Sequence, residues 1–73
     1  MIKIDRWPPP IDWTEVVLLW EDILDRKIYR DFTSWLEETH GGRYHIHGYE
    51  STLGFAVRFE KPEDAILFKL RWV

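Results

Sequence analysis

The chain has 73 residues, a formal net charge of −3, no cysteine, and 45% hydrophobic residues. This length fits a single domain, and the composition lies far from the low-hydrophobicity, high-charge signature of disorder. The absence of cysteine excludes disulfides and thiolate metal sites, so packing, aided by five Trp, three Tyr and four Phe, must hold the fold together. No window approaches the roughly 18 apolar residues of a membrane span, and no signal peptide is recognisable, so we expect a cytoplasmic protein without membrane contact.

The first third of the chain predicts a strand followed by a helix. Residues 1–7 alternate apolar and polar side chains as a strand does, and Pro8-Pro9-Pro10 must end it. A helix is predicted over residues 12–26, where Asp12 and Glu15 form a capping-box pattern. At about 100° per residue, six apolar side chains of this helix share one stripe. They are Trp13, Val16, Val17, Trp20, Ile23 and Leu24.

A second helix is predicted over residues 31–40, capped by Asp31 or Ser34. One bent helix from residue 12 to residue 39 is the alternative, since the periodicity blurs around residues 25–31. The pair Gly41-Gly42 ends the helical region in either case.

The second half predicts a hairpin and a final helix. Strands are expected near 43–49 and 53–60, joined by a turn at residues 50–52. Pro62 and the acids that follow it begin a helix near 62–70. Strict alternation over residues 68–73 leaves a final strand open as the alternative.

These elements predict one α+β domain over residues 1–73, a small antiparallel sheet packed on helices in a partial ferredoxin-like arrangement. We expect six large aromatic side chains to meet in its core. They are Trp13, Trp20, Phe55, Phe59, Phe68 and Trp72.

The C-terminal block of the sequence carries a recognisable pattern. It reads Gly54-Phe-Ala-Val-Arg-Phe-Glu-Lys-Pro-Glu-Asp-Ala-Ile-Leu-Phe-Lys-Leu-Arg-Trp72. It resembles the ending of small uncharacterised proteins of tailed bacteriophages, which share Phe-x-Phe-x-x-x-x-Asp-Ala-x-x-Phe-x-Leu-x-Trp. The matching residues are Phe59, Asp64, Ala65, Phe68, Leu70 and Trp72, while Val57 replaces the first Phe. The resemblance implies a phage accessory factor located in the host cytoplasm, and it carries over no catalytic residue.

Charge distribution indicates how such a factor would bind. From Asp12 to Glu38 the chain has eight acids and three bases, a local balance of −5, which suits a host protein with a basic surface. Leu18 and Leu19 fall outside the apolar stripe, so either another element covers them or they face a partner. The predicted partner-binding residues are Glu15, Leu18, Leu19, Asp22, Asp25 and Tyr29. A homodimer through Leu18, Leu19 and a sheet edge is a further alternative.

Other functions have weaker support in the sequence. Weak binding of RNA or single-stranded DNA is the alternative for the outer face of the hairpin, although net negative charge opposes it. The residues predicted for it are Arg43, His45, His47, Tyr49 and Arg58. A metal at His45 and His47 would need His40 or Glu50 to complete it, and we predict none. With no nucleophile elbow and no phosphate loop, we predict no enzyme and no cofactor.

Overall fold

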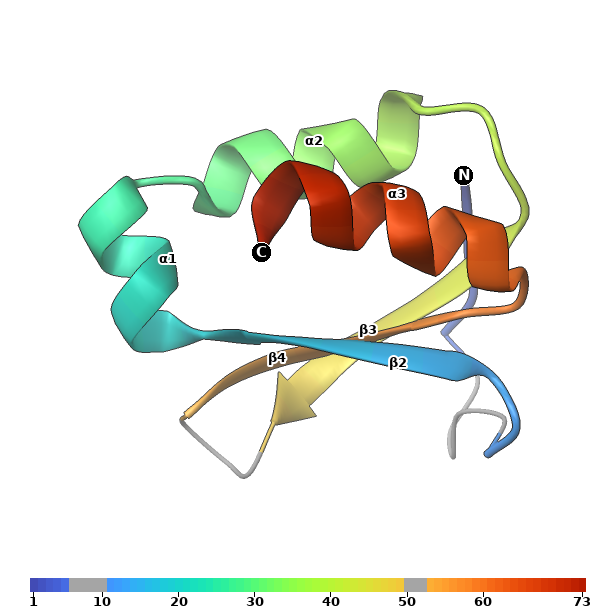
Figure 1. The fold of residues 1–73 in the computed structure, drawn as a ribbon, viewed down its shortest axis with the longest axis horizontal. Coiled ribbons are helices and arrows are strands. Elements are labelled where there is room, and N and C mark those ends of the chain that lie inside the picture. Colours follow the sequence, from blue (N-terminus) through green and yellow to red (C-terminus); the bar gives the residue numbers. More distant parts are fainter. Residues whose placement is uncertain (6–10, 50–52) are drawn as a thin grey trace.

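A computed structural model describes residues 1–5, 11–49 and 53–73. These residues form a four-stranded sheet with α2 and α3 over one face and α1 at one end (Figure 1). The predicted α+β class is therefore confirmed. The strands are β1 (Ile2–Lys3), β2 (Thr14–Leu19), β3 (Arg43–Tyr49) and β4 (Gly54–Phe59), and the helices are α1 (Trp20–Arg26), α2 (Tyr29–Glu38) and α3 (Pro62–Trp72).

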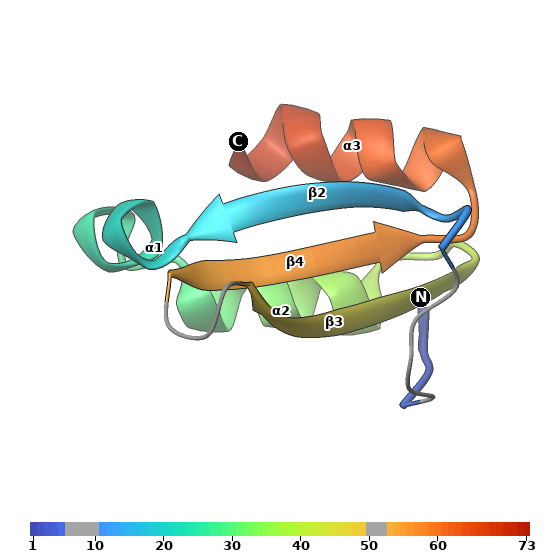
Figure 2. The same cartoon turned by 90° about the horizontal axis from the view of Figure 1, so that it is seen from below.

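The sheet has the strand order β1-β3-β4-β2 (Figure 2). β4 is antiparallel to both β2 and β3, whereas β1 is parallel to β3, so the sheet is mixed rather than wholly antiparallel. Apart from β1, the topology is that of a ferredoxin-like unit without the strand that follows its last helix. That strand would lie beside β2. No described strand lies there, so β2 is an edge of the described sheet.

The predicted helix over residues 12–26 is wrong in its first half. Thr14–Leu19 is a strand paired along its whole length with Gly54–Phe59, and the helix begins only at Trp20. Val16 and Leu18 turn toward the helices and are buried, which is the two-residue alternation of a strand. β-Branched side chains favour this conformation, but pairing with β4, about 40 residues later in the chain, decides it.

The remaining elements agree better with the predictions. The strand near 43–49 is confirmed, and the strand near 53–60 and the helices near 31–40 and 62–70 shift only at their ends. The predicted caps Asp31 and Ser34 are wrong, because α2 begins at Tyr29 and both residues lie within it. The single bent helix is wrong, because Lys27 adopts a left-handed conformation with φ 53° and ends α1. The final strand over 68–73 is also wrong, because α3 continues to Trp72.

The first predicted strand is short. Within residues 1–5, only Ile2–Lys3 is a strand. The predictions for residues 6–10 and for a turn at 50–52 lie outside the described residues.

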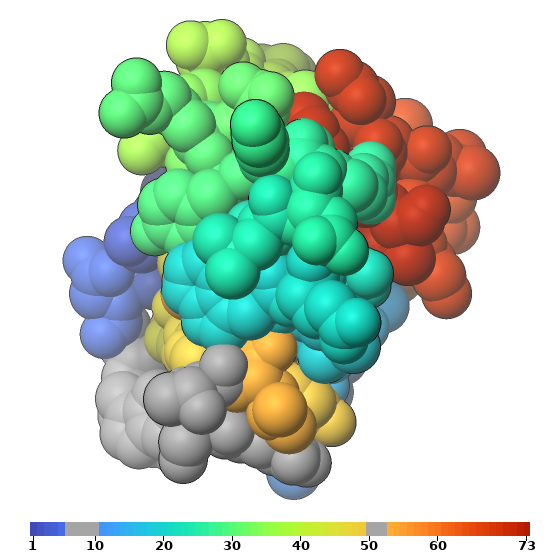
Figure 3. Space-filling view, turned by 90° about the vertical axis from the view of Figure 1, so that its left-hand side faces the viewer, coloured from blue at the N-terminus to red at the C-terminus, as the bar shows by residue number. Residues whose placement is uncertain are grey.

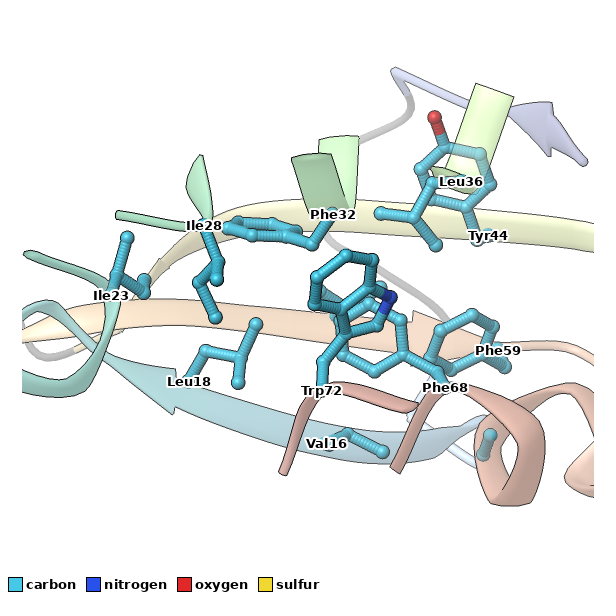
Figure 4. Packing of buried hydrophobic residues seen from close by; sticks show 12 residues of the cluster. Val16, Leu18, Ile23, Ile28, Phe32, Leu36, Tyr44, Phe59, Phe68 and Trp72 are labelled. Carbon is cyan, nitrogen blue, oxygen red and sulfur yellow. The ribbon is translucent and has the colours of Figure 1, made fainter. Parts of the chain in front are cut away.

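The core lies between the sheet and the two helices that cover it (Figure 4). Phe32 of α2 meets Phe68 of α3 edge to face, with ring centroids 6.1 Å apart, and Phe68 in turn lies 5.3 Å from Phe59. Of the predicted core aromatics, Phe59, Phe68 and Trp72 are buried, and Trp20 and Phe55 pack partly buried at the margin. Trp13 lies outside this core, because it precedes β2 in a bend, where the Arg43 guanidinium lies over its ring.

Candidate functional site

The end of the molecule beyond the sheet is formed by α1 (Figure 3). We define the α1 face as six exposed apolar, acidic and aromatic residues of this end, which are Leu19, Glu21, Asp22, Leu24, Asp25 and Tyr29; the cations Arg26, Lys27 and Arg30 of the same segment are exposed as well. Leu24 is 65% exposed, although it is a large apolar side chain on a helix. None of the three carboxylates around it forms an ion pair with any described residue. The α1 face thus presents an uncovered leucine and three carboxylates, next to exposed cations at the C-terminal end of α1 and the start of α2.

Buried contacts hold this face in position. Ile23 is 1% exposed and inserts the inner side of α1 into the core. Trp20 stacks on Tyr29 with centroids 5.8 Å apart and planes inclined by 17°, which fixes the start of α1 against the start of α2. Arg26 donates a hydrogen bond to the carbonyl of Trp72 at the end of α3. The α1 face is therefore a supported surface and not a free helix.

Two predicted partner-binding residues do not belong to the α1 face. Leu18 is only 3% exposed, because its side chain points into the core, whereas its neighbour Leu19 is 41% exposed. Glu15 lies on β2, on the sheet face away from the helices, where its carboxylate pairs with Arg58 at 3.1 Å. The structure thus brings together Leu19, Asp22, Asp25 and Tyr29, and it adds Glu21 and Leu24, which the sequence analysis did not select. The sequence analysis had placed Leu24 on the buried apolar stripe of the helix predicted over residues 12–26.

The outer face of the hairpin carries the residues predicted for nucleic acid. Arg43 donates from Nε to both carboxylate oxygens of Glu60 at 3.2 Å and also pairs through Nη2, and its guanidinium lies 5.4 Å from the centre of the Trp13 ring. This hydrogen bonding lowers the pKa of Glu60 below its ordinary value and raises the pKa of Arg43. Arg58 on the neighbouring strand β4 pairs with Glu15. The guanidinium groups of Arg43 and Arg58 are therefore both neutralised by neighbouring acids.

The two strand histidines of this face contact each other. His45 Nδ1 and His47 Nδ1 are 3.3 Å apart, and His45 is only 4% exposed. At such a distance one ring nitrogen donates and the other accepts, so the two rings are hydrogen-bonded to each other. Since both arginines of this face are paired with acids, the face is not strongly cationic. Tyr49 lies at the far end of the same strand and is half-buried.

A groove lies between the open edge of β2 and α3. Its volume is about 440 Å³. The lining residues are Thr14, Glu15, Val16, Val17, Ala65, Ile66, Lys69 and Val73. The sequence analysis missed this groove, because it depends on β2 being a strand and on that strand lying at an edge. The signal available in the sequence was that apolar side chains occur in almost every direction around the last helix, which is more than one core face needs; Ile66 and Val73 are among those left exposed.

Within the described part of the chain, no group of three or more His, Asp or Glu side chains is placed to hold a metal ion. None of the described helices combines the length and apolar character needed to traverse a bilayer. In comparisons with known proteins, no family model matches the chain, and no curated protein or solved structure is significantly similar to it.

Proposed function

We propose that the protein is a non-enzymatic interaction module that binds a basic surface of another protein through the α1 face. The observation that carries this proposal is Leu24, which is 65% exposed beside the carboxylates of Glu21, Asp22 and Asp25, none of which pairs with a described cation. An apolar anchor with carboxylates beside it is suited to a partner that has an apolar pocket next to basic side chains. Tyr29 extends the surface with an aromatic side chain whose ring is already fixed by stacking.

The resemblance of the C-terminal block to small phage proteins supports a phage accessory factor, whose partner is then a host protein. Long-range attraction between the α1 face and a basic surface accelerates association and weakens as salt increases, because exposed charges are screened over roughly 8–10 Å at physiological ionic strength. Nucleic acid is not proposed, because the arginines of the outer sheet face are already paired with acids.

Affinity purification from host lysate followed by mass spectrometry tests the proposal. The test variant combines Glu21→Gln, Asp22→Asn and Asp25→Asn, and the matched control combines Glu37→Gln and Glu38→Gln on α2, whose carboxylates are equally exposed. We expect the test variant to lose the principal basic partner and the control to retain it. Retention of that partner by the test variant would refute the proposal that the α1 face binds it.

The variant Leu24→Ala tests the apolar contribution of Leu24 to binding separately from the contribution of the carboxylates. We expect this variant to weaken binding of the purified partner by about tenfold, with little change in salt dependence, because an exposed leucine contributes apolar area and no charge. Leu67→Ala is the control, since Leu67 is also about half exposed but lies on α3. Equal affinity of the two variants would contradict the role of Leu24.

A further inference from the structure

The open edge of β2 exposes backbone hydrogen-bonding groups in a defined pattern. Trp20 donates its N–H to the carbonyl of Leu53 at 2.7 Å, continuing the register in which Leu19 lies opposite Gly54. Hydrogen-bonded pairs alternate along an antiparallel ladder, so Leu18, Val16 and Thr14 direct their backbone groups toward β4. It follows that Glu15, Val17 and Leu19 direct theirs to the open edge, where no described strand receives them.

The space beside this edge has the size and lining of a strand site. A groove of about 440 Å³ runs between β2 and α3. Its inner wall is apolar, with Val16 on the strand and Ala65, Ile66 and Val73 at the helix. The place is also the one that the missing strand of a ferredoxin-like unit would occupy, antiparallel to β2. A strand bound here would form hydrogen bonds with the backbone groups at the β2 edge. It would also cover Ile66 and Val73, which are 58% and 61% exposed.

The position of α3 decides which kind of strand fits. Figure 1 shows α3 above the sheet, and Figure 2 shows it beyond the β2 edge, so that α3 overhangs the place beside β2. The β2 strand of a second copy would bring its own overhanging helix into the space that α3 already occupies. A single extended segment with no helix above it avoids this collision.

The charged residues of the groove indicate which side chains the bound segment carries. Glu15 and Lys69 are the charged residues of the lining, and the Glu15 carboxylate is already paired with Arg58. The ammonium of Lys69 has no ion pair among the described residues. Among the described side chains, the groove therefore presents one positive charge without an ion pair in a largely apolar lining, which favours an acidic side chain in the bound segment.

We propose that the β2 edge binds an extended peptide segment of another protein by strand addition, antiparallel to β2. The segment has apolar side chains at alternate positions beneath α3 and a carboxylate that meets Lys69. Glu15, Val17 and Leu19 each exchange two backbone hydrogen bonds with it, about six in all. Leu19 offers its backbone groups to this edge and its side chain to the α1 face, but the other residues of the two surfaces differ, so binding of the peptide does not depend on the function proposed above.

The probe is a capped peptide with the six-residue length of β2. It alternates valine with threonine and carries one glutamate. We expect it to shift and protect the backbone amides of Glu15, Val17 and Leu19 in NMR spectra. N-Methylation of the alternate peptide amides that face β2 should weaken binding at least about tenfold, whereas methylation of the other amides should not, because those point away from the edge. Equal affinities of the two methylated peptides would overturn the proposal, as would protection confined to β1.

Variants of the protein give an independent test. Val17→Pro removes the central edge donor, and Val17→Thr keeps it with a similar side-chain shape, so only the first should lose the peptide. Lys69→Glu should reverse the preference to a peptide with lysine in place of glutamate. Light scattering should give the 8.9 kDa mass of one chain at all concentrations. A doubled mass together with protection of the Val17 amide would make a second copy the occupant and overturn the proposal.

Discussion

Replacing Gly54 by alanine tests the close contact between β2 and β4. Gly54 lies opposite Leu19, and a Cβ added to it would stand 2.1 Å from the Leu18 carbonyl oxygen and 2.8 Å from the Leu19 Cα. Ordinary van der Waals contact begins near 3.4 Å. Both obstructing atoms belong to the backbone, so no side-chain rotation relieves the clash. The end of β2 must therefore move by about 1 Å or more.

The cost of this movement has two parts. Overpacking of a well-packed site costs about 1–3 kcal/mol. Displacing the end of β2 also weakens the hydrogen bond from Trp20 N–H to the Leu53 carbonyl, a net loss of about 0.5–1.5 kcal/mol. Together the free energy of unfolding should fall by about 2–4 kcal/mol, out of the roughly 4–11 kcal/mol expected for a chain of 73 residues. The midpoint of thermal unfolding should fall by about 10–30 °C.

Urea denaturation followed by tryptophan fluorescence and circular dichroism measures this change. Gly42→Ala is the matched control, because a Cβ at Gly42 meets only methylene carbons of the flexible Lys61 side chain, at 3.1–3.2 Å. The control should change the free energy of unfolding by less than about 0.5 kcal/mol. If Gly54→Ala unfolds at the same urea concentration as Gly42→Ala, the reasoning is refuted.

Three further predictions follow from buried or paired groups. Phe32→Ala should cost about 3–5 kcal/mol in urea denaturation, because Phe32 is 0% exposed; a loss below about 1 kcal/mol would contradict its central place in the core. Asp64→Ala should cost about 1–3 kcal/mol, since Asp64 Oδ2 accepts the Gly42 N–H at 2.9 Å, and Asp64→Asn should recover most of it; equal losses would exclude the acceptor role. The pKa of Glu60, lowered mainly by its hydrogen bond to Arg43, should rise back toward the ordinary value of a glutamate in Arg43→Gln when the carboxyl carbon is titrated by NMR. A lowered carboxyl pKa means that the pair stabilises the fold above the unfolded-state pKa and that this contribution is lost as the pH falls through the folded-state value; an unchanged titration in the variant would show that Arg43 is not the cause.

Local signals predicted the elements whose partners are near in sequence. The strand at Arg43–Tyr49 and its neighbour at Gly54–Phe59 form a hairpin, so alternation and the intervening turn determine them within one short segment. The helix that begins at Pro62 follows from its proline and its early acids. These parts of the α+β fold could be predicted from residue order alone.

Thr14–Leu19 could not be predicted in the same way. Val16, Val17 and Trp20 share a stripe at the helical period, while Val16 and Leu18 also share a face at the strand period, so the pattern is compatible with both. Only the pairing with Gly54–Phe59 resolves it. The same error moved Leu18 and Glu15 into the predicted docking surface and left Leu24 out of it. The groove beside Lys69 was missed because a sheet edge is a property of strand order, which no local pattern contains.

Strand order also dictates when this protein can fold during its synthesis. Both outer strands, Ile2–Lys3 and Thr14–Leu19, come from the first 19 residues, but the strands they flank come from Arg43–Phe59. Each outer strand leaves the ribosome about 40 residues before its partner, which is a delay of about 2–8 s at 5–20 residues per second. During this interval the segment Val16-Val17-Leu18-Leu19 has no native neighbour, and its apolar side chains are open to chaperones and to other nascent chains.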